Sequence, residues 1–189
     1  MLKKQLLTLA AIVGILACGA CFAPSRYTPP PPPPIAVEGL KNLRVVVRDG
    51  TGSARLNPAA LAAVIVQNFN YRFHNNGLSA HLAEQPGDDG IAEVKIVSVT
   101  AARNPDVVAN GEQSWKFEVK TVVSLTRSNG QVLWQGAEAT DSPQLNSYAT
   151  EEEEMWRDPF VQSQLLRAVG GRVVHTVAFQ APLTRPNGP

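Results

Sequence analysis

The sequence predicts an α+β fold, with two helices packed on one face of a mainly antiparallel sheet of four to five strands. Residues 115–125 alternate strictly between apolar and polar side chains, which is typical of a strand with one buried face. Two other segments, one early and one late in the chain, repeat apolar residues at helical spacing. The order of strand, helix, three or four strands and helix predicts that both helices cover the same face of the sheet.

The first strand and the first helix follow one another at the start of the folded part. The run Leu43–Arg48 is rich in β-branched residues, which favours a strand. Asn57 suits the N-cap of a helix, Pro58 suits its first position, and Gly77 supplies a stop. The apolar face of this helix is formed by Leu61, Val64, Ile65, Phe69 and Phe73.

The rest of the sheet follows this helix. We expect a short edge strand over Ser79–Leu82 and a longer strand over Ile91–Val99. Arg103–Glu112 is polar and contains proline, so it is predicted to be a long exposed loop. After the alternating strand, Asn129-Gly130 indicates a type I′ hairpin turn, and the chain then returns as a strand to about Ala139.

The last helix is predicted to start at Asp158-Pro159, because proline is suited to a first turn and breaks a helix interior. Upstream, Thr150 and Glu153 have the spacing of a capping box. Gly170-Gly171 weakens the helix by about 1 kcal/mol per glycine relative to alanine, so we expect the pair to pack closely against the sheet. Residues 182–189 begin with a proline that ends the helix, and they form a predicted disordered tail.

The amino end predicts an exported lipoprotein. Residues 1–17 combine a basic start, an apolar run and small residues at the end, which is typical of a cleaved signal peptide. This segment ends in Ile-Leu-Ala before Cys18 and resembles the lipobox of bacterial lipoproteins, in which the cysteine becomes the first residue and carries the lipid. We favour Cys18 as the lipidated residue, with Cys21 as the alternative. A transmembrane anchor would need about 20 apolar residues, and an ordinary secretory cut after Ala23 would be followed unfavourably by Pro24.

Residues 18–39 form the lipidated cysteine and a proline-rich tether. Pro29–Pro34 are six consecutive prolines, which hold an extended polyproline II rod. A proline-rich recognition motif is the alternative interpretation of this run. Residues 40–181 are long enough for one periplasmic α+β domain, and because they contain no cysteine this domain must be stabilised by burial alone.

Charge and motifs argue against several functions. The chain has 17 basic and 16 acidic residues, and removal of the two signal lysines leaves 15 against 16, so nucleic-acid binding is not expected. We find no serine-nucleophile elbow, phosphate loop, dinucleotide fingerprint or zinc spacing. His74, His81 and His175 are expected at the surface or at helix caps, and Asp88-Asp89 in a solvated loop. We therefore predict no enzyme, no catalytic residue, no metal and no cofactor.

One set of residues is a candidate binding site. Arg44 and Arg48 share one strand face, and so do Lys116 and Lys120. Both faces are opposite the apolar set, so these four cations are expected on the exposed side of the sheet. Such a surface suits lipid phosphates or an acidic protein wall. The alternative is that the four residues only make the surface soluble.

The ordered set of features resembles the lipopolysaccharide-assembly lipoprotein family (LptE-like). The resemblance covers residues 40–180 and rests on the lipobox cysteine, the early strand, the amphipathic helix Pro58–Phe73, the strand at Glu93–Ile96, the alternating strand, the Asn129–Trp134 return and a terminal helix. The proline rod, the Asp158-Pro159 break and the Gly170-Gly171 pair depart from the family pattern.

The resemblance implies a non-catalytic protein anchored to the outer membrane by its N-terminal lipid. Such proteins sit inside the lumen of a β-barrel lipopolysaccharide translocon, help it to assemble and interact with lipopolysaccharide. Gly19 is not the aspartate that retains many lipoproteins on the inner membrane, so outer-membrane sorting is implied by analogy. A lipoprotein activator of a peptidoglycan synthase and an accessory lipoprotein of a lipid ABC transporter are the competing interpretations.

We expect mass spectrometry of the chain purified from membranes to find acyl groups on Cys18, with residues 1–17 removed. The lipobox pattern is the reason, because processing of such a signal links lipidation to cleavage at the same cysteine. Unmodified thiols at both Cys18 and Cys21, together with protein released into the medium, would contradict the lipoprotein interpretation.

Overall fold

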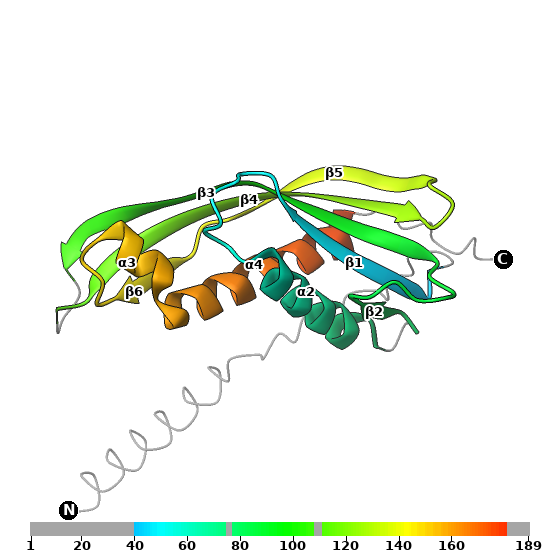
Figure 1. The fold of residues 1–189 in the computed structure, drawn as a ribbon, viewed down its shortest axis with the longest axis horizontal. Coiled ribbons are helices and arrows are strands. Elements are labelled where there is room, and N and C mark those ends of the chain that lie inside the picture. Colours follow the sequence, from blue (N-terminus) through cyan, green and yellow to red (C-terminus); the bar gives the residue numbers. More distant parts are fainter. Residues whose placement is uncertain (1–39, 75–76, 108–110, 181–189) are drawn as a thin grey trace, which may run out of the picture. The chain divides into compact units, whose positions relative to one another are not determined.

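The computed structural model describes residues 40–74, 77–107 and 111–180, without the side chains of 105–107, 136–140 and 179–180. The predicted signal peptide, tether and tail lie outside the described residues. The described chain runs in the order β1 (Asn42–Asp49), α2 (Pro58–Phe73), β2 (Ser79–His81), β3 (Gly90–Val107), β4 (Gln113–Arg127), β5 (Val132–Asp141), β6 (Gln144–Ser147), α3 (Glu152–Arg157) and α4 (Pro159–Gln180). Figure 1 shows α2 and α4 on the same side of the sheet, which confirms the predicted α+β class.

The sheet is mixed, with six strands in place of the predicted four to five. Its order is β2-β1-β3-β4-β5, and β6 pairs with a further stretch of β4. β1 is parallel to β2 and β3, because α2 carries the chain back across the sheet before those strands begin. The pairs of β4 with β3, β5 and β6 are antiparallel. β6 escaped prediction because its four residues, Gln144–Ser147, include no β-branched or aromatic side chain.

α2 begins where the sequence predicts. Asn57 caps it, accepting hydrogen bonds through Oδ1 from the backbone N–H groups of Ala59 at 3.0 Å and Ala60 at 3.1 Å. Its buried face contains Leu61, Ile65, Phe69 and Phe73, and the last two rings stack with centroids 5.6 Å apart. Val64, from the predicted apolar face, is half-buried beside α4.

α4 also begins at the predicted position, but α3 has no capping box. Asp158 accepts a hydrogen bond from the Phe160 N–H at 2.9 Å, which caps the start of α4. The N-cap of α3 is Glu151, and no side chain caps that helix, so the box predicted from Thr150 is wrong. Glu152, together with the next two glutamates, places negative charge at the helix N-terminus, which is favourable without a cap.

The core lies between the helices and the side of the sheet that faces them. The predicted alternation in β4 is confirmed, because every second residue from 115 to 125 is buried. Phe117 of β4 meets Trp156 of α3 edge-on, with ring centroids 5.3 Å apart. The largest fully buried side chains are Phe69, Phe73, Phe117, Leu43, Leu56, Leu61, Ile65, Ile96, Leu125, Met155, Leu165 and Val94.

The exposed loop predicted over Arg103–Glu112 is wrong over its first half. β3 continues to Val107 and β4 starts at Gln113, so the residues from Arg103 to Val107 extend a long hairpin. The strand pairing shifts between Arg103 and Val107, and this irregularity accommodates Pro105, which cannot donate to a regular ladder. The Arg103 Nε donates to Gln113 Oε1 at 2.8 Å and joins the two strands at this end.

The turn between β4 and β5 is a hairpin, but it is not type I′. A type I′ turn needs positive φ at both central residues. Gly130 has φ of +86°, whereas Asn129 is not among the described residues with positive φ. The Asn129 Oδ1 instead accepts from the Gln131 N–H at 3.0 Å, and the Gly130 N–H bonds to the Arg127 carbonyl at 2.9 Å. The loop is therefore a type I turn followed by a left-handed glycine.

The glycine pair of α4 separates into two different roles. A Cβ added at Gly170 would lie 2.7 Å from Val64 Cγ1 of α2, whereas one added at Gly171 would meet nothing within 4 Å. The predicted close packing therefore exists at Gly170, but the partner is α2 and not the sheet. Gly170 lets the two helices approach each other on one face of the sheet.

We expect Gly170→Ala to lower the free energy of unfolding by about 1 to 2 kcal/mol. The added methyl group overpacks against Val64, and this costs more free energy than the better helix propensity of alanine contributes. Gly171→Ala is the matched control and should raise it by up to about 1 kcal/mol through propensity alone. Urea denaturation of both variants measures the difference. Equal stabilisation by the two alanines would show that the Gly170–Val64 contact does not limit helix approach.

Candidate functional site

One side of the sheet carries none of the described helices, and we call it the open face. In Figure 1 it is the upper side of the sheet, with α2 and α4 on the lower side. The buried residues of β1, β3 and β4 point toward the helices, so the residues that alternate with them point to the open face. Its described charged side chains on these strands are Arg44, Arg48, Glu93, Lys95, Lys116, Glu118 and Lys120.

The structure places all four predicted cations on the open face but does not gather them. Arg44 of β1 is paired with Ile91 of β3, and Lys116 of β4 is paired with Ala102 of β3. Ile91 and Ala102 are eleven positions apart along β3, which separates the two cations by about 36 Å of strand rise. These two residues therefore cannot bind one small anion together.

Arg44 is also engaged elsewhere. It forms an ion pair with Glu84 in the loop that follows β2, and its side chain is 22% exposed. Its role in the structure is to hold this loop against the sheet. Among the described residues, Lys116 has no ion-pair partner and is exposed.

Arg48 and Lys120 lie closer together, and Lys95 lies between them. Arg48 of β1 is paired with Lys95 of β3, and Lys95 is paired with Val122 of β4, two residues from Lys120. Neighbouring strands are about 4.8 Å apart, so the three cations form a diagonal across three strands. We call Arg48, Lys95 and Lys120 the basic diagonal.

The carboxylates near the basic diagonal neutralise it only weakly. Arg48 Nε lies 2.8 Å from Glu93 Oε1, with side-chain exposures of 69% and 44%. Lys120 Nζ lies 3.4 Å from Glu118 Oε1, with exposures of 40% and 49%. Ion pairs this exposed contribute between about 0 and 1 kcal/mol. The cations can therefore exchange these partners for an incoming anion at little cost.

Lys95 was missed by the sequence prediction. The signal was present, because Ala92, Val94 and Ile96 are buried and alternate with Glu93 and Lys95. The parallel pairing of β1 with β3 could not be read from the sequence, and without it nothing placed Lys95 beside Arg48. The Lys95 stem also packs along the turn after β1, since a Cβ at Gly50 would lie 2.7 Å from Lys95 Cε.

The Asp88-Asp89 pair is not solvated as predicted. Asp88 Oδ1 lies 2.6 Å from His81 Nε2, with side-chain exposures of 12% and 13%, so His81 is an internal partner and not a surface residue. Asp89 Oδ2 accepts from the backbone N–H groups of Lys41 at 2.8 Å and Asn42 at 3.0 Å. These bonds fasten the loop after β2 to the start of β1. His74 and His175 are exposed, as expected.

Both carboxyl groups have lowered pKa values. Hydrogen bonds from the Lys41 and Asn42 N–H groups lower the pKa of Asp89 below 3.8, against the effect of burial. Burial acts to raise the pKa of Asp88, but the hydrogen bonds from Gln85 N–H and His81, with the charges of His81 and Arg44, outweigh it and lower the pKa. Both groups stay ionised at neutral pH and act as structural anchors.

Within the described ranges, no three histidine, cysteine, aspartate or glutamate residues come together in a way that could hold a metal ion. None of the helices there is both long and apolar enough to cross a membrane. The chemistry that the open face offers is electrostatic contact with anionic groups.

No protein-family model and no curated protein match this sequence. Several solved structures are similar at low identity. A minor lipoprotein from Acinetobacter baumannii has 11% identity and a TM-score of 0.45, covering 78% of this chain and 98% of that chain. Rare lipoprotein B from Shewanella oneidensis has 9% identity and a TM-score of 0.40, with 72% and 93% covered. A protein from Xanthomonas campestris has 14% identity and a TM-score of 0.42, with 80% and 89% covered. Similarity this low says nothing about what the present chain binds.

We expect Asp89→Asn to lower the free energy of unfolding at pH 7 by about 1 kcal/mol, because charge-assisted hydrogen bonds to two backbone donors become neutral ones. The folded-state pKa of Asp89 lies below 3.8, so its contribution is complete above that pH and is lost as pH falls through the folded value. In denaturant unfolding, the difference between the two proteins should therefore be complete at pH 7 and shrink as the pH is lowered below 3.8. Asp141→Asn is the control, since that carboxylate accepts a hydrogen bond from the Ser142 N–H next to it in the chain, a local contact.

Proposed function

We propose that this chain is a non-catalytic lipoprotein of the outer membrane that docks through its open face onto the wall of a β-barrel lipopolysaccharide translocon. In that role it serves as a plug and assembly partner and contributes to lipopolysaccharide transport. The observation that carries the proposal is the uncovered basic face of the sheet, on a chain whose amino end has a lipobox at Cys18.

The open face suits a large acidic partner better than a small ligand. Its five cations outnumber its two carboxylates among the described side chains, and they spread over three strands. A flat, extended surface of this kind matches a wall that carries several carboxylates, each replacing a weak internal ion pair. Arginine and lysine also bind phosphate oxygens, which gives lipopolysaccharide phosphates a second set of contacts on the same residues.

The lipid anchor reduces the cost of this weak, electrostatic docking. Each buried CH2 of an acyl chain contributes about 0.8 kcal/mol, and stable anchoring takes more than one chain. A domain held at the membrane meets a membrane-bound partner at high effective concentration, so modest contacts are sufficient. This explains how a binding module of this kind can work through weak electrostatic contacts.

The proline-rich run favours a second candidate function, that of a lipoprotein activator of a peptidoglycan synthase. Such activators also place a proline-rich tether before a small α/β domain, and they generally need a longer linker than this one to reach an inner-membrane enzyme. An accessory lipoprotein of a lipid ABC transporter is a third candidate. The three differ in the partner, so identifying that partner separates them.

Mild detergent extraction of the tagged full chain, followed by mass spectrometry of what co-purifies, tests the proposal. Recovery of a large outer-membrane β-barrel together with lipopolysaccharide supports it. Recovery of a transpeptidase supports the synthase activator, and recovery of an ABC transporter supports the third candidate. Either result removes the barrel proposal.

Reversing the charge of two residues in the basic diagonal should weaken binding to the β-barrel partner. We expect Lys95→Glu combined with Lys120→Glu to reduce the recovered barrel at least about tenfold at physiological salt, because two attractive contacts become repulsive. Quantitative mass spectrometry of the co-purified partner measures the loss.

Arg157→Glu combined with Arg167→Glu is the matched control. It makes the same change in net charge at exposed positions on α3 and α4. Equal losses for the two double variants would mean that total charge, and not the open face, governs binding. Unchanged recovery after reversal of the diagonal would remove it from the site.

A further inference from the structure

β2 and β6 are two of the edge strands of the sheet, and they differ in how their free edges are covered. β2 pairs with β1 on one side, and on the other side the Asn70 side chain mimics a strand, accepting from Ala80 N–H at 2.7 Å and donating to Ala80 C=O at 3.0 Å. β6 pairs with β4. Within the described part of the chain, no strand or side chain covers the other edge of β6. Natural proteins usually protect such edges, because an uncovered edge can pair with a strand of another chain.

The alternation of hydrogen bonds between β6 and β4 shows which backbone N–H and C=O groups of β6 are not bonded to β4. The Phe117 N–H bonds to the Pro143 carbonyl at 3.0 Å, immediately before β6. Antiparallel pairs alternate between bonded and non-bonded positions. Leu145 and Ser147 therefore exchange backbone bonds with β4. The N–H and C=O groups of Gln144 and Asn146 point away from β4.

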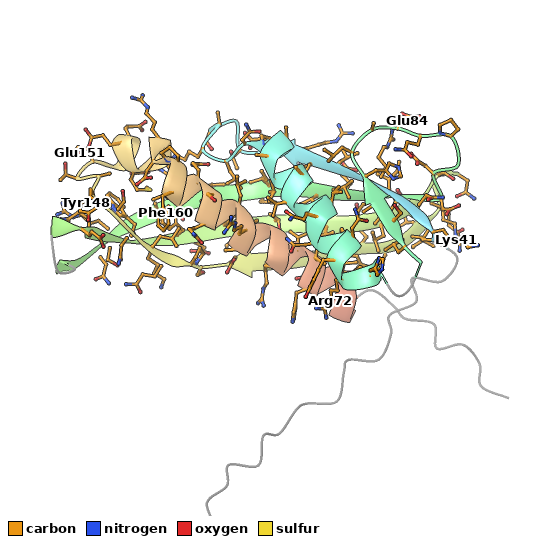
Figure 2. All side chains as sticks on the ribbon, turned by 90° about the horizontal axis from the view of Figure 1, so that it is seen from below. Lys41, Arg72, Glu84, Tyr148, Glu151 and Phe160 are labelled. Carbon is orange, nitrogen blue, oxygen red and sulfur yellow. The ribbon has the colours of Figure 1, made fainter. Side chains whose placement is uncertain are left out.

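A groove runs along this free edge. It has a volume of about 640 Å3 and is lined by β6, Tyr148, Phe160 and Gln164, with Glu112 also in its wall. The side chains of Tyr148 and Phe160 are 69% and 59% exposed, which is high for aromatic residues. Figure 2 shows these two residues at the same end of the domain, near Glu151 and far from Lys41 and Glu84.

The walls of the groove are fixed to one another. The Ser147 hydroxyl donates to Asp158 Oδ2 at 2.7 Å and accepts from the Ala149 N–H at 3.1 Å. Because Asp158 also caps α4, it links the end of β6 to the start of α4. A preformed groove with free backbone groups lowers the ordering cost of binding.

The surroundings of the groove are acidic. Glu112 accepts a hydrogen bond from the Tyr148 hydroxyl, and this bond, together with the Glu112 charge, raises the pKa of Tyr148. α3 adds three glutamates in its first turn, directly after Glu151. A partner segment with basic residues complements this charge.

We propose that β6 is a strand-addition site for an extended, basic peptide segment of a partner protein. The segment pairs with the outward N–H and C=O groups of Gln144 and Asn146. It places an apolar side chain in the groove that Tyr148 and Phe160 line. Main-chain hydrogen bonds supply affinity, and the aromatic groove and acidic rim select the sequence. The site uses the sheet edge, so it does not depend on docking through the open face.

The experiment uses the full chain in detergent and a labelled seven-residue peptide, with lysine at both ends and alternating threonine and phenylalanine between them. Fluorescence anisotropy measures its binding, and hydrogen exchange reports which amides it protects. We expect protection to increase at Gln144 and Asn146 while Leu145, already bonded to β4, stays unchanged. The same peptide with alternate backbone nitrogens methylated keeps all side chains and should bind at least about tenfold more weakly.

Two variants locate the site. Asn146→Pro removes an N–H that β4 does not use, and proline is tolerated at a sheet edge, so this variant should fold and bind at least about tenfold more weakly. Phe160→Ala should also bind several-fold more weakly, because it removes one aromatic wall. Tyr71→Ala, which removes an aromatic side chain 88% exposed on α2, is the matched control and should bind as the unchanged chain does.

The proposal is overturned by equal binding of the methylated and unmethylated peptides, or by no binding at millimolar concentration. It is also overturned if the amides of Gln144 and Asn146 gain no protection. Binding of a neutral hexasaccharide in place of the peptide would make the groove a glycan site. Dimerisation of the chain in place of peptide binding would make this edge a contact between two copies.

Discussion

The placement of both long helices on one side of the sheet is the constraint on which the rest of the structure depends. α2 and α4 lie against each other on that side, where Gly170 allows Val64 to approach the α4 backbone. The helices then cover the apolar residues of β1, β3 and β4, and none of the described helices covers the other side. The open face is therefore a direct result of how the core is built.

The elements that the sequence predicted well are those whose signals are local. Asn57-Pro58 and Asp158-Pro159 fix two helix starts through cap chemistry, and the alternation in β4 fixes which of its faces is buried. The hairpin turn was placed correctly at Asn129-Gly130, but its type was wrong, since the Asn129 side chain bonds to Gln131 N–H and Asn129 avoids positive φ.

The errors came from features that depend on distant parts of the chain. Polar residues and a proline over Arg103–Glu112 favour a loop, yet β3 continues to Val107 through pairing with β4, with an irregularity at the proline. Asp88-Asp89 has the composition of a solvated loop, yet His81 and the start of β1 provide partners far away in sequence. For the same reason the sequence showed four cations on the exposed side of the sheet, but it could not show that Lys95 lies between Arg48 and Lys120.

The parallel position of β1 also has a consequence for the order of folding. β3 and β4 are joined by a short connection and pair over most of their length, so this hairpin closes a small loop and can form early. β1 finds both of its neighbours only after α2, β2 and the beginning of β3 have been made. β1 precedes the other described strands along the chain, yet it is among the last to be incorporated, because it must stay unpaired until about fifty more residues of chain have followed it.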